Sequence, residues 1–176
     1  MRQIVIAFVA ACALVGCSPV VEPPPPPPTE ETPPGPVFTE KEQAYVDAVY
    51  AYLDVWTQIA QNPTGDTWDL IREVTRWPAD DHDVELFVIW ARDGFHLEGG
   101  PTFTPATVQW ASVDFEGERY RVFGCYDRSG GFLVDRDGTP VKSQGAESSF
   151  GWYEVIQTPE GRFFVTNNDA MEDRTC

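Results

Sequence analysis

The densest cluster of side chains that could do chemistry is the run Asp80-Asp81-His82-Asp83. Carboxylate and imidazole groups bind metal ions, but a metal site needs several of them to converge on one point. Consecutive residues at the start of a helix fan outward, and acidic side chains there stabilise the helix N-terminus through its free N–H groups and its dipole. The run therefore predicts a helix start, with Asp80 or Asp81 as the cap, and no metal site.

Acid–base chemistry would need a carboxylate in a pocket and a phenol or acid to stabilise an oxyanion. Three tyrosines of one predicted helix could supply the phenol: Tyr45, Tyr50 and Tyr52. Asp114 and Glu154 are the nearest candidates for the base, although neither stands out on an inward strand face. His96 lies between two apolar residues and fits a packed or edge position. The sequence also has no nucleophile motif, phosphate-binding glycine loop or dinucleotide fingerprint, so we expect no catalytic residue and no cofactor.

Leu14-Val15-Gly16-Cys17 places a cysteine at the end of a short hydrophobic leader. Arg2 supplies a positive charge before the apolar run 4–14, which has the length of a signal-peptide core and is too short to span a bilayer. The leader resembles a bacterial lipoprotein signal, with residues 14–17 as its lipobox. The resemblance implies that the thiol of Cys17 is acylated with diacylglycerol and that the signal peptide 1–16 is removed. An ordinary secretory signal, cut near residues 11–13, is the alternative.

Residues 17–37 continue from this cysteine as a proline-rich stalk, with six consecutive prolines at 23–28. Proline has a fixed φ and no N–H, so the stalk favours polyproline II and predicts a stiff spacer of roughly 60 Å. We therefore expect a protein that a lipid anchor holds at the cell membrane, on the extracytoplasmic face. A proline ligand for the aromatic grooves of other proteins is the alternative, although such partners are mostly intracellular.

The remaining residues, 38–176, are enough for one globular domain with one core. The formal charge of the chain is −16, and its acidic residues are scattered rather than grouped in a tail. A surface of this sign repels nucleic acids and anionic lipid headgroups, so we expect no nucleic-acid partner. The same charge favours solubility, and it could attract basic partners.

The chain has four cysteines, of which Cys12 leaves with the leader and Cys17 takes the lipid. Cys125 and Cys176 then remain, and two cysteines in an oxidising exported compartment most simply pair with each other. Closing a loop of this length would stabilise the domain by up to roughly 4 kcal/mol. No CxxC motif or Cys/His grouping surrounds either residue, which argues against a metal site or a free thiol pair.

Apolar residues at spacings of three and four predict an amphipathic helix over 39–61. Thr39 and Glu42 have the spacing of a capping box, and Phe38 stands at the position of a staple residue. A short second helix is expected over 66–74, with its first residue as the cap.

Residues 81–92 fit two patterns, because their apolar residues alternate as in a strand and also form a helical face. Arg92 in the last turn and Gly94 beyond it favour the helix. We therefore predict a third helix here.

From Phe103 onward, short apolar runs alternate with turn residues, which predicts hairpins. The expected strands are 107–115, 118–126, 131–134, 148–157 and 162–166, and the expected turns are 116–117, 135–138 and 159–161. Helices followed by an antiparallel meander predict an α+β domain with the helices on one face of the sheet.

Several of these features together resemble the small exported lipoproteins of actinobacteria that carry a nuclear transport factor 2-like (cystatin-like) domain. The features are the proline-rich stalk, the Tyr- and Trp-rich helix, Gly65-Asp66 before the second helix, the run Val122–Asp127, the turn 135–138 and the closing run Gly161–Thr166. The resemblance covers 38–176 and implies a curved antiparallel sheet wrapped against helices into a cone. It also implies that Cys125 and Cys176 are the disulfide pair.

A cone of this kind has a partly apolar mouth, which we expect to be lined by Tyr52, Trp56, Phe87 and Trp110. The function that we expect is binding of a protein partner or a small apolar ligand, without catalysis, because aromatic side chains anchor ligands well. The alternative is a pocket enzyme of ketosteroid isomerase or dehydratase type, which would need a carboxylate and a tyrosine in one apolar cavity. The fold does not decide between them.

Overall fold

The computed structural model describes residues 35–141, 147–171, 174 and 176, and its first helix, α1 (Glu40–Gln61), begins at the predicted capping box. The hydroxyl of Thr39 accepts a hydrogen bond from the amide of Glu42, whose carboxylate accepts one from the amide of Thr39 at 2.8 Å. These bonds satisfy N–H groups that the first turn leaves free. The buried face of α1 has the predicted spacing and consists of Tyr45, Val46, Val49, Tyr52, Leu53, Ile59 and Ala60.

The second predicted helix is wrong in detail. Instead of one helix capped by Asp66, the chain forms a 3₁₀ helix, η1 (Gly65–Leu70), followed by one α-helical turn, α2 (Ile71–Val74). Thr64 occupies the cap position of η1 and makes no side-chain cap hydrogen bond. The hydroxyl of Thr67 donates to the carbonyl of Thr64 at 2.9 Å, and such local bonds compete with a regular helix start.

The third helix, α3 (Ala79–Asp93), confirms the helical interpretation of this segment and rules out the strand. It ends at Gly94, whose φ of 80° is the left-handed conformation that favours glycine at a helix C-terminus. The predicted cap is wrong, because Pro78 occupies the cap position and Asp80 and Asp81 lie in the first turn. The fixed φ of proline suits a helix start, so the helix begins before the acidic residues can cap it.

Four strands form one antiparallel sheet in the order β2-β3-β5-β6. Their bounds are β2 (Thr102–Asp114), β3 (Gly117–Asp127), β5 (Ser148–Gln157) and β6 (Phe163–Ala170). The meander of hairpins is therefore as predicted, with turns at the expected places. The register shifts at Pro105/Thr107 and Trp110/Ser112 in β2 and, between β5 and β6, at Glu154/Val155, and such bulges bend a sheet.

Two features of the sheet differ from the prediction. The segment β1 (His96–Gly99), for which the sequence analysis gives no strand, pairs with β4 (Gly131–Val134) in a small second sheet. β2 begins five residues earlier than the predicted 107, and it contains Pro105. Proline lacks the N–H of a sheet ladder, but β2 is an edge strand and Pro105 lies at a bulge, where a strand tolerates it.

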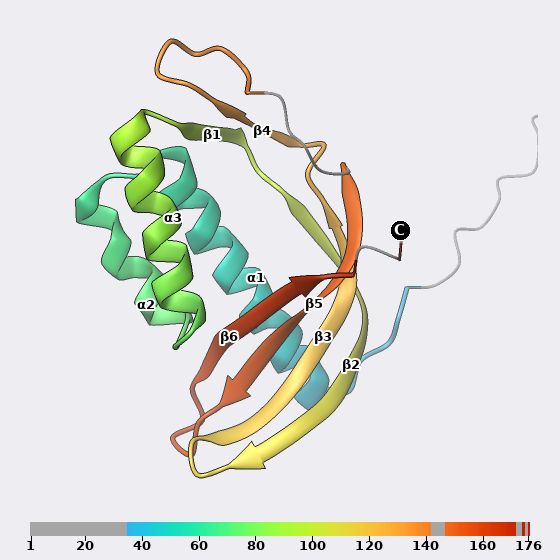
Figure 1. The fold of residues 1–176 in the computed structure, drawn as a ribbon. Helices are drawn as coiled ribbons and strands as arrows, with labels where there is room; N and C mark the ends of the chain where they lie inside the picture. The colour runs from blue at the N-terminus through green and yellow to red at the C-terminus, as the bar shows by residue number, and fades with distance from the viewer. Residues whose placement is uncertain (1–34, 142–146, 172–173, 175) are drawn as a thin grey trace, which may run out of the picture. The chain divides into compact units, whose positions relative to one another are not determined.

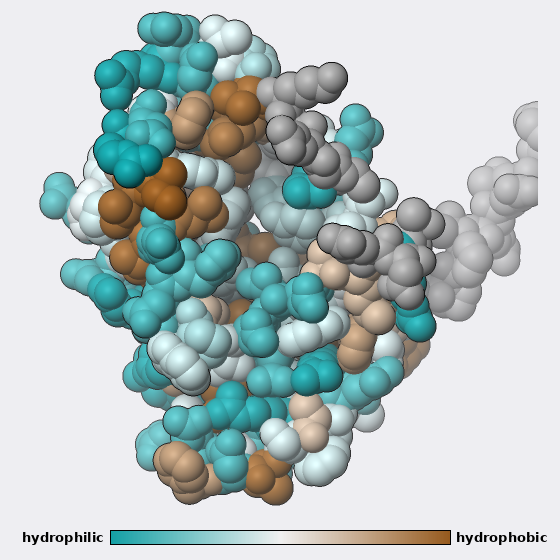
Figure 2. All heavy atoms as spheres, in the orientation of Figure 1, coloured by the Kyte–Doolittle hydropathy of each residue, from teal (hydrophilic) through white to brown (hydrophobic). Residues whose placement is uncertain are grey.

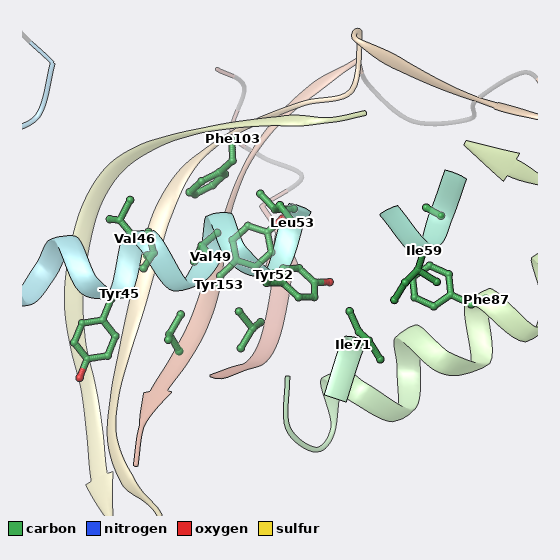
Figure 3. Close-up of a cluster of buried hydrophobic side chains, with 14 residues drawn as sticks. Tyr45, Val46, Val49, Tyr52, Leu53, Ile59, Ile71, Phe87, Phe103 and Tyr153 are labelled. Atoms are coloured by element: carbon green, nitrogen blue, oxygen red, sulfur yellow. The ribbon is translucent and has the colours of Figure 1, made fainter. Parts of the chain in front are cut away.

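The three α-helices lie on one face of the curved four-stranded sheet (Figure 1). The core fills the space between them, and Figure 3 shows side chains of α1 in contact with side chains of the sheet and of the other helices. Some of its aromatic members pack edge to face, as Phe103 and Tyr153 do with ring centroids 5.2 Å apart, and others are tilted, as Tyr52 and Tyr153 are. The expected α+β fold, with helices packed on a curved antiparallel sheet, is confirmed.

Residues 35–176 form a compact unit of their own. Within the described ranges, no helix combines the length and the apolar character needed to cross a bilayer. The signal peptide 1–16 and the lipid-carrying Cys17 that we expect lie outside the described residues, as does most of the stalk 17–37.

Candidate functional site

The site centres on a buried carboxylate on α3, that of Asp83, whose residue is only 3% exposed. Its Oδ1 atom accepts hydrogen bonds from the hydroxyl of Tyr52 at 3.4 Å and from the indole Nε1 of Trp56 at 3.2 Å. Tyr52 and Trp56 are four residues apart on α1, so they project from the same face of that helix. The contact therefore depends on the packing of α3 against α1, which brings together groups 27 and 31 residues apart.

The second oxygen of this carboxylate, Oδ2, is buried and has no hydrogen-bond partner among the described residues. A buried acceptor without a donor is costly and is rare in native structures, so each case calls for an explanation. Burial raises the pKa of Asp83 to about 6, against the opposing effect of the hydrogen bonds from Tyr52 and Trp56. The carboxyl group thus changes charge close to neutral pH.

A pocket of about 240 Å³ opens beside this carboxylate. It is bounded by α1 and α3 on one side and by residues of β2, β3, β5 and β6 on the other, and Figure 2 shows the surface hollowed between the helices and the sheet. Six aromatic side chains line it: Tyr52, Trp56, Phe103, Tyr126, Trp152 and Tyr153.

The three phenols of the pocket stay neutral at physiological pH. Burial raises the pKa of Tyr126 to about 12, and it also raises the pKa values of Tyr52 and Tyr153 well above the ordinary value of a tyrosine. The hydroxyl of Tyr52 points away from the sheet, toward the side of α3 (Figure 3). The pocket therefore combines apolar ring surfaces and neutral hydroxyl groups with the carboxylates of Asp83 and Asp169, the imidazole of His82 and the guanidinium of Arg128.

Two of the four predicted pocket residues line this pocket, and two lie elsewhere. Tyr52 and Trp56 are in the lining. Phe87 is fully buried behind it and packs against Trp56 with ring centroids 5.8 Å apart, so it supports the wall without reaching the cavity. Trp110 is 62% exposed on β2, where an edge strand has a neighbour on one side only.

The carboxylates that the sequence named as candidate bases do not meet a tyrosine of α1. Asp114 accepts the amide of Glu116 at 2.8 Å at the turn after β2. Glu154 forms ion pairs with Arg119 and Arg121 on the neighbouring strand β3. These are structural contacts of the sheet, outside the aromatic pocket.

Tyr45 and Tyr50 are also outside the pocket. The hydroxyl of Tyr45 donates to the side chain of Gln157 at 3.5 Å, and its ring packs against Tyr120. Tyr50 is exposed on α1. Of the three tyrosines considered, only Tyr52 contacts a carboxylate within the described part of the chain, and that carboxylate belongs to Asp83.

The burial of Asp83 was not predicted, because the sequence groups this residue with the acidic residues of the helix start. A signal for its burial was present in the spacing: Ala79, Asp83 and Phe87 recur every four residues, and these are the buried residues of α3. A carboxylate within an apolar helical stripe predicts a buried charge. In the described ranges, no group of three or more metal-binding side chains occurs around it or anywhere else.

Cys125 on β3 and Cys176 lie within disulfide distance of each other, with their Cα atoms 5.7 Å apart. This separation is in the range that disulfides require. The chain end is thereby placed against the sheet.

No family model matches the chain, and no curated protein matches it. Among solved structures, it is similar to the intermembrane-space region of the chloroplast protein ARC6, with 12% identity and a TM-score of 0.55 over 77% of this chain and 98% of that one. It is also similar to a candidate aromatic ring hydroxylase from Novosphingobium aromaticivorans, with 15% identity and a TM-score of 0.44 over 78% and 98% of the two chains. At these identities, the similarity to the ARC6 region shows a common fold alone.

Proposed function

We propose that the domain binds a small, largely apolar ligand in the aromatic pocket beside Asp83, without catalysis. The observation that carries the proposal is that Asp83, whose buried Oδ2 atom has no hydrogen-bond partner among the described residues, lines a cavity together with six aromatic side chains. Ligand pockets typically combine apolar walls with a few polar groups that fix the orientation of the ligand. A ligand with an apolar body and one hydrogen-bond donor would pack against the aromatic rings and supply the donor that Oδ2 lacks.

We also propose that the protein is an exported lipoprotein, held at the extracytoplasmic face of the cell membrane through Cys17. The lipobox-like leader and the proline-rich stalk support the anchor, and the resemblance to nuclear transport factor 2-like lipoproteins supports the whole arrangement. A Cys125–Cys176 disulfide fits the same location, because disulfides persist in oxidising compartments.

One observation favours a second candidate, an acid–base enzyme of isomerase or dehydratase type. The carboxylate of Asp83 and the phenol of Tyr52 meet at 3.4 Å at the pocket, and a base with a pKa of about 6 is suited to proton transfer near neutral pH. Binding is the better account, because Oδ1 of Asp83 already holds the hydroxyl of Tyr52 and the indole of Trp56. An oxyanion would need those donors for itself.

The experiment is a ligand screen on the full-length chain with small aromatic compounds that are neutral, anionic or cationic, followed by tryptophan fluorescence. A ligand should change the emission of the two pocket tryptophans, Trp56 and Trp152, so Trp56→Phe should reduce that change and Trp56→Phe combined with Trp152→Phe should abolish it. Trp110→Phe is the matched control, because it removes an exposed tryptophan outside the pocket. Binding that persists unchanged in a Trp56→Leu variant, or a complete absence of binding, would contradict the proposal.

The same screen tests the second candidate, an acid–base enzyme of isomerase or dehydratase type. Ketone or hydroxy-ketone members should be recovered unchanged after incubation if the pocket only binds. Exchange of an α-hydrogen with solvent deuterium, lost in Asp83→Asn, would favour the isomerase type instead.

A further inference from the structure

The groups that donate hydrogen bonds to the buried carboxylate carry no positive charge, although His82 and Arg128 also line the pocket. These donors, Tyr52 and Trp56, are both neutral. Within the described ranges, none of the ion pairs of the structure includes Asp83. An ionised carboxylate in such a position is favourable only when a positive charge reaches it.

The surroundings of the carboxylate suit an organic cation better than a metal ion. A metal ion of the Ca²⁺ or Mg²⁺ type needs several oxygen ligands, and no group of three candidate ligand residues occurs in the described part of the chain. Aromatic faces attract ammonium groups through their quadrupoles, most strongly where water is excluded. Tyr52 and Trp56, which donate to the carboxylate, supply such faces from α1. Tyr126 and Tyr153 supply them from the sheet, and all four line the pocket.

The size of the cavity restricts the ligand further. A volume of about 240 Å³ lies below the range of roughly 300–1,000 Å³ that drug-sized ligands occupy. An amine with a short chain and one ring fits such a space. The net charge of −16 would also draw cations toward the protein.

Building on the proposed binding function, we infer that the pocket selects a small organic amine in its protonated form. The ammonium group donates a hydrogen bond to Oδ2 of Asp83, and the apolar body of the amine lies against the aromatic rings of the pocket. The inferred contact supplies the partner that Oδ2 lacks and the positive charge that the buried carboxylate needs. A charge-assisted hydrogen bond of this kind is about twice as strong as a neutral one.

Binding of the amine then depends on the ionisation of Asp83, so it weakens when acid protonates the carboxylate. Charged and titratable groups around the pocket come from every wall. They are Tyr52 on α1, Asp80 and His82 on α3, Tyr126 on β3, Arg128 after it, Tyr153 on β5 and Asp169 on β6. Of these, Asp80 raises and His82 lowers the pKa of Asp83 through their charges.

The test compares 2-phenylethylamine with its neutral isostere 2-phenylethanol by calorimetric titration of the full-length chain. At about pH 8 the amine should bind at least about tenfold more tightly than the alcohol, as expected for a charge-assisted contact. Between about pH 8 and about pH 5 the affinity for the amine should fall several-fold, while the affinity for the alcohol stays constant.

Asp83→Asn keeps the shape of the side chain and should remove both the preference for the amine and its pH dependence. Asp81→Asn is the matched control, since Asp81 is exposed on the same turn of α3 and lies outside the pocket lining. His82→Gln should keep the pH dependence, which assigns it to the carboxylate and not to the neighbouring imidazole.

Equal affinities for amine and alcohol, or a preference for the amine that survives in Asp83→Asn, would overturn the inference and leave the proposed binding function standing. Tighter amine binding at low pH would also overturn it. If neither compound binds and the neutral members of the screen fail as well, the proposed function itself is wrong.

Discussion

At the scale of single residues, Asp83 is placed where it lowers the stability of the fold. Its pKa is raised to about 6, because the folded protein holds the carboxylate away from water. The unfolded chain exposes it, so the folded state binds the proton more tightly than the unfolded state does. Sites that hold such costs are often functional, since selection for binding or catalysis opposes selection for stability.

We predict that Asp83→Asn raises the free energy of unfolding at about pH 7 by about 2–3 kcal/mol, because it removes the cost of an ionised carboxylate in the core. The cost is fully present above the folded pKa of about 6 and disappears as the pH falls toward 3.8, the ordinary value, below which both states are protonated. Denaturant unfolding at about pH 7 and about pH 4 measures the difference. A variant less stable than the wild type at about pH 7 would show that the carboxylate has a stabilising partner.

The same residue shows what sequence patterns can predict about side chains. Tyr52 and Trp56 were assigned to a pocket because they belong to the apolar face of a long helix, and that face is visible in the sequence. Asp83 was not assigned to the pocket, because an acidic residue near a helix start is equally well explained by its stabilising effect on the helix N-terminus. The packing of the two helices determines which side of α3 meets α1. A local sequence pattern does not predict this packing.

For the cysteines, we predict that Cys125 and Cys176 form a disulfide in the natively purified protein. Their Cα separation of 5.7 Å allows the bond without movement of the backbone. A non-reducing digest should contain the two cysteines in one linked peptide, which reduction separates. Free thiols that are alkylated at both positions without reduction would refute the bond.

At the scale of elements, local signals predicted those boundaries that local contacts determine. The capping box of Thr39 starts α1, and the left-handed Gly94 ends α3, both as expected. β1 was missed because it has four residues and owes its structure to β4, which lies more than thirty residues later. A strand that depends on a distant partner has no pattern of its own to detect.

The first helix boundary gives a prediction at this scale. Thr39→Ala removes the hydroxyl that accepts the amide of Glu42, and it should lower the free energy of unfolding by about 1 kcal/mol. Thr64→Ala is the matched control, since Thr64 stands at the cap position of η1 and its side chain makes no cap hydrogen bond. Both variants are compared by denaturant titration. Equal losses in the two would mean that the hydrogen bond of Thr39 contributes nothing specific.

At the scale of the whole molecule, the pocket is a product of the fold as a unit. Helices from the first half of the domain supply Asp83 and its two donors, and strands from the second half supply the opposite aromatic wall. The sequence predicted both layers and their order, because hydrophobic periodicity and turn residues are local. The curvature that brings the strands to the helices was expected from the family resemblance alone, since it depends on register shifts in β2 and between β5 and β6 that no local pattern contains.

The last prediction concerns the place of the whole chain in the cell. If the leader is a lipoprotein signal, the thiol of Cys17 carries the lipid that holds the domain at the membrane, and Cys17→Ala should release the protein from the membrane fraction. Cys12→Ala is the matched control, because it changes a cysteine of the leader that the lipobox does not include. Phase separation in a nonionic detergent measures the outcome: the wild type and Cys12→Ala should enter the detergent phase, and Cys17→Ala should stay in the aqueous phase. A Cys17→Ala protein that still enters the detergent phase would refute the lipid anchor, and the acidic domain would then need another route to the membrane.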